Sequence, residues 1–323
     1  EQDRFKVIAR KPSYHGNTLG ALATGYHEGR RAPYAPLLRE THYIDVPYRY
    51  RMMREDETEA EFATRLAQQL EDKIGELGAK NVMAFVLEPV VGATLGCVTS
   101  PKAYFKTIRE ICDKHGVLLI ADEVMCGMGR TGTTYALEQE GITADITTLA
   151  KGLGAGYQPI AAVLTAKKIM SVISQGSGKL WNGHTYMSHA VAAAAALAVQ
   201  EYIESENLHD NIRVRGRQLE GCLQSAFSTH PHVGDIRGRG LFWSIELVED
   251  KASKKPYAAT DQIAIKIGAA ALENGMMCYP TQGCANGIDG DHVLLAPSYT
   301  SSAEEITTIV DLLERAVSVV VGD

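Results

Sequence analysis

Short runs of apolar residues, each ended by a charged or turn-forming residue, recur through the first half of the chain. Such runs are typical of strands that are buried on both faces of a parallel sheet. We predict five of these strands, at residues 5–9, 82–89, 117–123, 144–151 and 160–165. Helix-like stretches lie between several of them, as at residues 57–77 and 101–116. Strands that alternate with helices predict an α/β fold with a mostly parallel central sheet and helices on both faces.

The pattern changes after an alanine-rich helix at residues 190–199. A long helix at residues 208–227 is followed by shorter elements, with strands near 241–247, 276–280 and 292–297 and helices at 261–273 and 302–320. A chain of 323 residues is long enough for two domains. We therefore expect residues 1–205 to form a large α/β domain and residues 206–323 to form a smaller α+β C-terminal domain.

Charge and composition restrict the partners that we expect. The chain has 32 basic and 39 acidic residues, a formal net charge of −7, and no long Lys/Arg run, so nucleic acid is not an expected partner. The alanine-rich stretch is too short to cross a bilayer, so we interpret it as a buried or interface helix and expect no membrane partner. The six cysteines form no CxxC pair, which disfavours a zinc site or disulfides and favours the cytoplasm.

Ionisable residues stand at the ends of three predicted strands. Glu88 ends the second strand, Asp122 and Glu123 end the third, and Lys151 ends the fourth. Each has a simpler explanation alone, because lysines are mostly solvated and a strand-end Asp often caps the next helix. Ligands of open α/β sheets, however, bind outside the carboxyl ends of the strands. Three such endings together predict a site at this edge, with no metal among its components.

A lysine, a separate aspartate and a glycine-rich surround suit the cofactor pyridoxal 5'-phosphate. The lysine amine can form a Schiff base with the cofactor aldehyde, and a carboxylate opposite the pyridine nitrogen keeps that nitrogen protonated. Lys151 is followed by the glycines of "GLGAGY", which permit close approach to its amine. Lys151 and Asp122 are therefore the candidate catalytic pair.

The stretch "LLIADEVMCGMGRTG", followed by "ADITTLAKGLGAGYQPIAAVL", resembles the signature of the class III (omega-type) aminotransferases. These are fold type I enzymes that use pyridoxal phosphate. Further matching pieces occur in the same order, namely "SYHGNT", "EPVVG", "GHTYMSHAVAAAAAL", "IRGRGLFWSIEL" and "GDHVLLAPSYT". The resemblance therefore extends over essentially the whole chain, and it implies a fold type I α/β transferase.

The resemblance implies roles for individual residues. Lys151 resembles the Schiff-base lysine, and Asp122 resembles the partner of the pyridine nitrogen. Tyr14 resembles the aromatic residue that stacks on one face of the cofactor ring, and His15 belongs to the same turn. The simpler alternative for Tyr14 is an aromatic residue of the core.

Three further residues carry implied roles with simpler alternatives. Val90 resembles the residue that covers the opposite face of the ring, although it could serve only for packing. Glu88 resembles the acid that lines the site nearby. Thr185 resembles the threonine that reaches the cofactor phosphate of the neighbouring subunit, although it could be a helix N-cap. The role of Thr185 implies a homodimer with shared active sites.

Two departures from the family pattern affect these expectations. The chain starts at Glu1, after the place where the family has a turn of small residues that cradles the phosphate, so we expect either an incomplete sequence or weakened cofactor binding. The C-terminal stretch 276–300 contains no Arg to bind a substrate carboxylate, and Ser298 stands where a second proline is common. We interpret Arg130 and Arg237, which lie beside glycines, as structural residues that satisfy backbone carbonyls.

The expected reaction is transamination, in which an amine or ω-amino acid donates its amino group to a keto acid such as pyruvate. The alternatives are a class III relative that performs an internal amine shift or a decarboxylation, and a non-catalytic relative that has lost the phosphate site. A nucleotide-binding protein is disfavoured. "GLGAGY" lacks the third glycine of GxGxxG, and "GSGKL" does not match the phosphate-binding loop.

Overall fold

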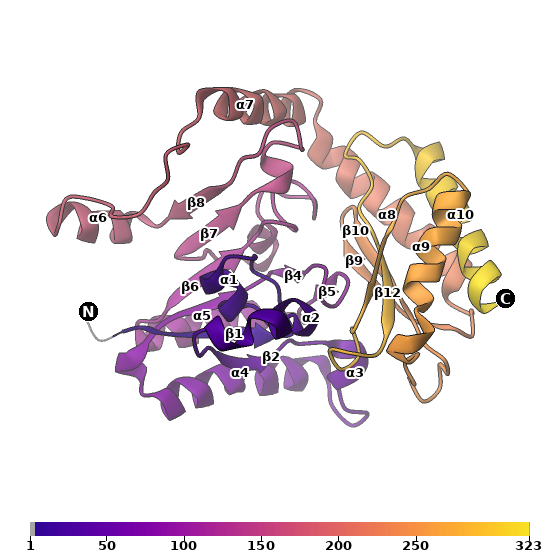
Figure 1. The fold of residues 1–323 in the computed structure, drawn as a ribbon, viewed down its shortest axis with the longest axis horizontal. Coiled ribbons are helices and arrows are strands. Elements are labelled where there is room, and N and C mark those ends of the chain that lie inside the picture. Colours follow the sequence, from indigo (N-terminus) through magenta and orange to yellow (C-terminus); the bar gives the residue numbers. More distant parts are fainter. Residues whose placement is uncertain (1–3, 323) are drawn as a thin grey trace.

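The computed structural model describes residues 4–322 and contains two sheets with their helices (Figure 1). The first sheet has the strand order β2-β1-β3-β6-β7-β8. Its neighbouring strands are parallel, except that β8 runs antiparallel to β7. The strands are β1 Lys6–Lys11, β2 His42–Asp45, β3 Val82–Leu87, β6 Leu118–Asp122, β7 Ile146–Leu149 and β8 Ala162–Thr165. The predicted α/β class is confirmed, and β2 is a strand that the sequence pattern did not reveal.

Two long helices, α4 (Glu59–Leu77) and α5 (Tyr104–His115), cover one face of the first sheet. α4 begins with a capping box, in which Thr58 and Glu61 each accept the other's backbone N–H. The apolar positions of both helices form one core cluster with sheet residues such as Phe85 and Leu119. This cluster fixes the strands whose carboxyl ends carry the candidate site.

Short helices occupy the crossover from β1 to β2 and the segment after β2. They are α1 (Leu19–Thr24), α2 (Glu28–Arg31), the 3-10 helix Ala32–Leu37 and α3 (Arg49–Met52). A small antiparallel hairpin, β4 (Val90–Val91) with β5 (Val98–Thr99), follows β3. The sequence pattern indicated none of these short elements, because each has too few residues for a visible period.

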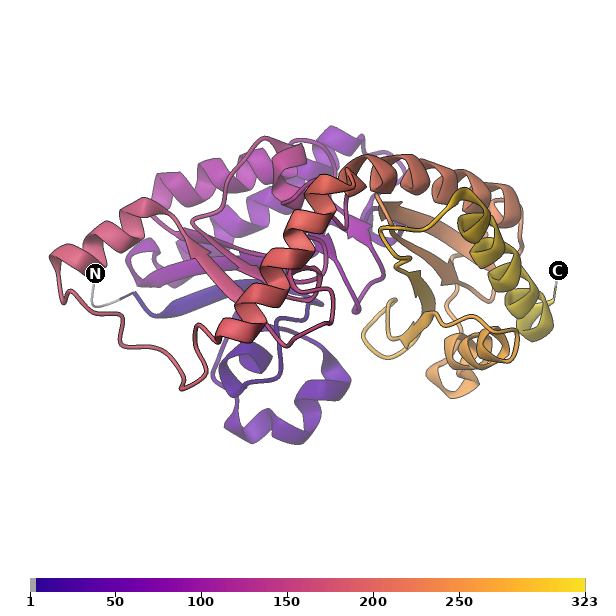
Figure 2. The same ribbon diagram turned by 90° about the horizontal axis from the view of Figure 1, so that it is seen from above.

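The second sheet is antiparallel, with the order β11-β12-β10-β9. Its strands are β9 Val233–Arg239, β10 Phe242–Leu247, β11 Tyr279–Gln282 and β12 Asp291–Leu295. Helices α8 (Leu208–Phe227), α9 (Ile263–Glu273) and α10 (Ala303–Val321) pack against it around one core (Figure 2). The strand expected at 276–280 lies later, at β11, and β9 was not predicted.

Alternate residues of β10 point to opposite faces of the second sheet. Trp243 and Ile245 belong to the core that α8, α9 and α10 form, whereas Phe242 packs with residues of the β4–β5 region. The second sheet is therefore buried on both faces, one of which meets the part of the chain that carries the first sheet.

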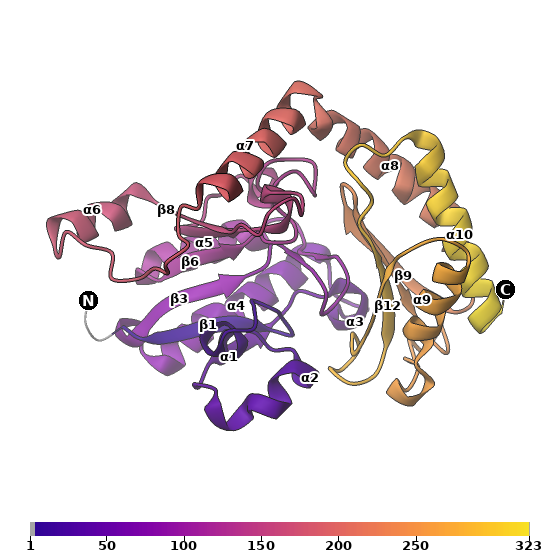
Figure 3. The same cartoon turned by 45° about the horizontal axis from the view of Figure 1, so that its top comes forward.

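The segment after β8 first projects from the first sheet and then returns past the Lys151 turn toward the second sheet (Figure 3). It comprises α6 (Lys167–Gln175), the connection 176–189 and α7 (Ala190–Ser205). Only Ala192, Ala196 and Ile203 of α7 are buried. The alanine-rich helix is thus not a buried helix within one chain, and the interface interpretation stays a prediction. The expected boundary between residues 205 and 206 falls between α7 and α8. We propose that the large domain ends and the small domain begins at this point.

No helix in the described range 4–322 is long and apolar enough to cross a membrane.

Candidate active site

The carboxyl ends of three neighbouring strands bring the predicted residues together. β3 pairs with β6 and β6 pairs with β7, all in parallel, so the segments that follow these strands leave from the same edge. Glu88 follows β3, Asp122 ends β6 and Lys151 lies two residues beyond β7. The arrangement that we expected at this edge is present in the fold.

Asp122 has a fixed orientation because three donors hold its carboxylate. The ring nitrogen Nδ1 of His15 lies 2.8 Å from Oδ2. The backbone N–H of Val124 donates to Oδ1 at 3.1 Å, and the Thr148 hydroxyl donates to the same oxygen at 3.3 Å. Nε2 of His15 is buried and has no hydrogen-bond partner among the described residues. An oriented carboxylate with a polarisable partner behind it suits a group that must hold a proton on a ligand.

Glu88 ties the Tyr14 turn to the strand edge. Its Oε1 accepts the backbone N–H of Tyr14 at 3.2 Å, and its Oε2 accepts the backbone N–H of Gly92 at 2.9 Å. The carboxyl group is buried, and this burial raises its pKa; His15 opposes the shift, and Asp122 adds to it. Glu88 therefore connects two backbone segments of the site.

Lys151 stands where a left-handed backbone turn follows β7. Its φ is +42°, a conformation that costs a non-glycine residue about 1–3 kcal/mol, and such strain is concentrated at functional sites. Partial burial away from water lowers the pKa of the amine, and the Asp122 and Glu88 carboxylates act in the opposite direction. Within residues 4–322, no hydrogen bond or ion pair holds this amine.

A cavity of about 910 Å³ opens at Lys151, a volume within the ordinary range of ligand sites. It is lined by residues of the Lys151 turn, by α7 and by the segment that follows β12. Arg130 and Tyr299 stand in its wall, with the guanidinium 4.5 Å from the ring centre. The lysine is therefore accessible from a space that several parts of the fold enclose.

Tyr14 is partly buried and carries a cation on its ring. The Arg30 guanidinium lies 4.7 Å from the ring centre and donates to the Tyr14 hydroxyl at 3.3 Å. His27 meets the same ring edge-on. Tyr14 is thus not enclosed by the core, and the stacking role stays available to it.

Val90 and Val124 differ in burial, which the sequence did not reveal. Val90 is completely buried and packs with Cys97, Cys126 and Phe242, so its surroundings favour the packing interpretation. Val124 is only half-buried, and it lies on the turn where its own N–H binds Asp122. The signal that could have identified Val124 is its position two residues after the aspartate, since the carboxylate and this side chain share one turn.

Thr185 lies away from these residues. It is exposed in the connection between α6 and α7, and the structure assigns it no hydrogen bond. Its implied contact is with a neighbouring subunit, and this role stays a prediction.

The adjacent acids Asp122 and Glu123 have different tasks. Glu123 points away from the site and accepts the backbone N–H groups of Ala136 and Leu137 at 2.6 and 3.1 Å. Burial raises the pKa of Glu123 to about 7. The second acid therefore holds a loop, and only the first faces the candidate site.

The guanidinium groups of Arg130 and Arg237 satisfy backbone carbonyls, as we expected. Arg130 donates to Leu241 O and Pro297 O at 2.9 and 2.6 Å, and Arg237 donates to carbonyls of the β4–β5 turn. No group of three or more His, Cys, Asp or Glu residues in the described range could hold a metal ion.

The residues that the structure brings together fit the pyridine ring and the aldehyde of pyridoxal phosphate. The Lys151 amine has no competing partner, the Asp122 carboxylate is oriented, and the cavity at Lys151 has room for a ring. Tyr14, His15 and Glu88 stand beside them. These features are independent of one another, and together they match the chemistry of the cofactor.

Comparisons with known proteins agree with this geometry. The sequence model of the family described as Aminotransferase class-III matches residues 1–317. The chain is 43% identical to an aminotransferase of Gibberella zeae over all of its own length and 64% of that protein. It is 44% identical to an aminotransferase of Schizosaccharomyces pombe, with 98% of this chain and 70% of that protein covered. The chain thus spans about two thirds of the length of these relatives.

A solved structure gives the same result. The omega transaminase from Pseudomonas jessenii in complex with PMP superimposes with a TM-score of 0.90 and 36% identity, covering 98% of this chain and 68% of that one. Class III aminotransferases use pyridoxal phosphate, and the fold here is their fold type I. From the matching family model, the relatives and the assembled lysine-aspartate site, we conclude that the chain belongs to the class III aminotransferases.

Proposed function

We propose that the protein is a pyridoxal-phosphate-dependent transaminase that moves an amino group from an amine or ω-amino acid to a keto acid such as pyruvate. The observation that carries this proposal is the position of Asp122 and Lys151 at the carboxyl ends of adjacent strands, with Asp122 oriented by His15. Lys151 also lines the cavity, and within residues 4–322 its amine has no hydrogen-bond or ion-pair partner.

The residues of the chain have distinct tasks in this reaction. Pyridoxal phosphate, when bound, links covalently to amines and draws electrons from the bonds at their Cα atoms. Asp122 would hold a proton at the pyridine nitrogen, and its three donors keep the carboxylate in place for that task. Tyr14 and the half-buried Val124 are our candidates for the two faces of the ring, with Val90 behind them in the core.

Lys151 would act twice. Its amine would be the covalent attachment point of the cofactor, and after its release it would take the proton from the donor Cα and deliver it to the former aldehyde carbon of the cofactor. The lowered pKa of the amine increases the neutral fraction that accepts a proton near neutral pH.

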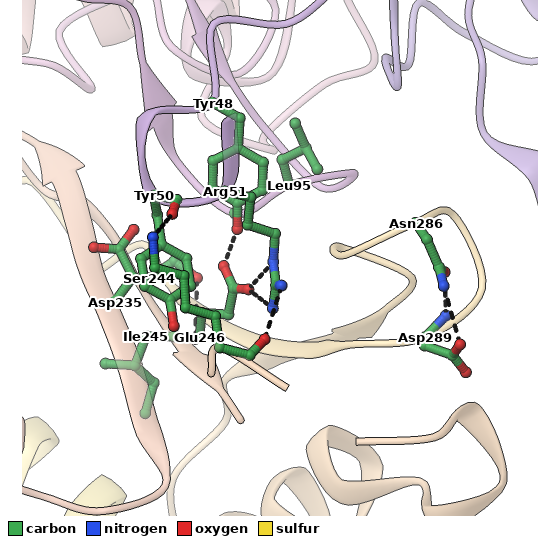
Figure 4. Close-up of polar contacts among 12 residues, drawn as sticks. Tyr48, Tyr50, Arg51, Leu95, Asp235, Ser244, Ile245, Glu246, Asn286 and Asp289 are labelled. Carbon is green, nitrogen blue, oxygen red and sulfur yellow. Dashed lines mark hydrogen bonds and ion pairs between the residues drawn. The ribbon is translucent and has the colours of Figure 1, made fainter. Parts of the chain in front are cut away.

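The choice of donor rests on the C-terminal loop. Stretch 276–300 has no Arg, the residue that binds carboxylates in a bidentate manner. At the tip of this loop, Asn286 donates to Asp289 at 3.0 Å, so this carboxylate is already paired within the loop (Figure 4). We therefore favour an amine or ω-amino acid over a dicarboxylic donor.

We also propose a homodimer with shared active sites. The connection 176–189 and α7 expose large apolar side chains, namely Leu180, Trp181, Tyr186, Met187, Val191 and Leu197. Patches of this kind mark interaction sites. Thr185 lies within this surface, which agrees with a role in the site of a second subunit.

The test is spectroscopic. The protein is mixed with pyridoxal phosphate, its visible absorbance is recorded before and after borohydride reduction, and the reduced adduct is located by peptide mass. We expect a visible band that converts into a stable adduct on Lys151. A folded sample with no band and no adduct would favour the non-catalytic relative.

A second assay separates the catalytic alternatives. Amine donors are supplied with and without pyruvate. Transamination requires the keto acid, whereas an internal amine shift or a decarboxylation gives product without any second carbonyl compound.

A further inference from the structure

A buried carboxyl group joins the two sheets of the molecule (Figure 4). Glu246 of β10 is 0% exposed, and three side chains converge on it. The Tyr48 hydroxyl and the Arg51 guanidinium reach it from the segment after β2, the latter with Nε at 2.6 Å. Arg237 of β9 reaches it from within the second sheet at 2.7 Å. Buried charges need such partners, so this group fixes α3 against the second sheet.

Arg237 extends the same network into the β4–β5 turn. Its Nε donates to Gly96 O at 2.6 Å, and its Nη2 donates to Leu95 O. Its guanidinium also lies over the Tyr48 ring, 4.8 Å from the centre. Its five N–H donors in a planar fork hold the Glu246 and Asp235 carboxylates together with the two backbone carbonyls, whereas lysine has three donors on a single nitrogen.

The turn that Arg237 holds leads directly to the candidate site. Within the turn, the Gly96 N–H donates to Gly92 O at 2.9 Å. The Gly92 N–H in turn donates to Glu88 Oε2, and the other oxygen of Glu88 accepts the Tyr14 N–H. A continuous path of hydrogen bonds therefore runs from Arg237 to the Tyr14 turn.

The second sheet also limits the space around this turn. Gly96 has a φ of +61°, and a Cβ at this position would overlap the Ser244 hydroxyl and the His292 ring. Both of these side chains are completely buried on the face of the second sheet that meets the turn. The turn is thus held by hydrogen bonds from one side and by packing from the other.

We propose that the Arg237–Glu246 pair is a positioning device, which sets the β4–β5 turn and through it Glu88 and the Tyr14 segment of the active site. The proposal rests on the transaminase function given above, and it adds residues that touch neither substrate nor cofactor. Its consequence is that the second sheet determines the geometry of a site whose catalytic pair lies on the first.

The chain offers a matched control. Arg109 of α5 pairs with Asp145 at 2.9 Å, and Asp145 also accepts the Leu119 N–H at 2.8 Å. This buried pair lies at the start of β6 and β7, the opposite edge of the first sheet. Loss of either pair should lower stability, but only loss of Arg237 should disturb the site.

The experiment compares Arg237→Lys with Arg109→Lys. In the holoenzyme we expect Arg237→Lys to lower kcat about 10- to 100-fold, with a smaller change in KM, since small misplacements of reacting groups have effects of that size. Its cofactor should bind more weakly by visible titration. Arg109→Lys should lower the melting temperature without either change.

Backbone hydrogen exchange gives a readout that does not need activity. In Arg237→Lys, the amides of Gly92 and Tyr14 should exchange faster, because their acceptor Glu88 is no longer held, while Arg109→Lys should leave both unchanged. If Arg237→Lys does not fold, Arg51→Lys replaces it, because Arg51 lies at the edge of the network with 14% of its side chain exposed.

The outcomes separate the two proposals. If the wild-type protein shows no transaminase activity but the Gly92 and Tyr14 amides still exchange faster in Arg237→Lys, the proposed function is refuted and the positioning device is kept. Unchanged exchange and unchanged kcat in both Arg237→Lys and Arg51→Lys, with only a lower melting temperature, would overturn the positioning device.

Discussion

The Asp122 edge of the first sheet differs in burial from the surface formed by residues 176–189 and α7. At the edge, Asp122 and Glu88 are buried, and donors from other segments hold both carboxyl groups. On the surface, Trp181 is 82% exposed and Leu197 is 60% exposed. The two carboxyl groups of the first region have their partners within one chain, whereas the apolar groups of the second are exposed among the described residues 4–322.

This difference indicates which part of the site a single chain can form and which part needs a second subunit. The carboxyl groups at the strand ends are held by donors of the same chain, some from nearby turns and some from distant segments such as the one that carries His15. Apolar groups on α7 gain free energy only when another surface removes them from water. We expect the catalytic pair to be assembled in the monomer and the rest of the site to require a second subunit.

The largest effect should come from removal of the lysine at the edge. Lys151→Ala should lower turnover by at least about 10⁴-fold, because the amine provides both covalent attachment and proton transfer. The exposed Lys167→Ala serves as the control and should retain normal rates in the same transaminase assay. Ordinary activity of Lys151→Ala would refute the assignment of the catalytic lysine.

Removal of the oriented carboxylate should have the next largest effect. Asp122→Asn should lower kcat about 100-fold or more, since a neutral amide no longer keeps the ring nitrogen protonated. His15→Asn should have a smaller effect of the same kind, because it removes one of three donors. Steady-state kinetics and cofactor titration measure both variants, and equal, minor losses would contradict the role of Asp122.

The exposed surface can be tested by adding charge to it. Leu197→Asp should leave the melting temperature of the single chain nearly unchanged, but it should shift the protein to monomers in sedimentation experiments and lower activity with them. Val319→Asp on α10 is the matched control, because Val319 is 76% exposed outside this surface. A dimer that persists in Leu197→Asp would place the interface elsewhere.

The two valines should separate stability from cofactor binding. Val90→Ala should lower the free energy of unfolding by about 2 kcal/mol, as expected for a truncated core side chain. Val124→Ala should change stability less and weaken cofactor binding more. Denaturant unfolding and visible titration measure the two effects, and the opposite assignment of effects would restore Val90 as the residue at the ring.

The smallest expected effect is the pH dependence of stability that arises from the free amine of Lys151. Its pKa lies below 10.5 in the folded protein without cofactor, so Lys151 binds its proton more weakly folded than unfolded. Stability should therefore rise slightly as pH increases through the lowered pKa. At about pH 8 to 9, acylation followed by peptide mass should label Lys151 faster than an exposed lysine with its usual pKa near 10.4, and slower labelling would contradict the shift.

Local signals in the sequence were enough to place three candidate residues at one edge of the sheet. Glu88, Asp122 and Lys151 could be placed on one edge because apolar runs end at them and parallel strands align their carboxyl ends. Val124, which we propose as a candidate for one face of the ring, also has a local signal, because it lies two residues after Asp122. The contact between His15 and Asp122, which are 107 residues apart, could not be read from either segment.

The chain by itself determined the α/β class, the three ionisable strand ends and the family resemblance, because apolar periodicity and short motifs are properties of neighbouring residues. Only the tertiary structure decided that Glu123 turns away from the site, that Val90 is core, and that Arg237 and Glu246 connect the second sheet to the Tyr14 turn. The physical reason is that burial and hydrogen-bond partners depend on residues distant in sequence, and those distances close only when both sheets are formed.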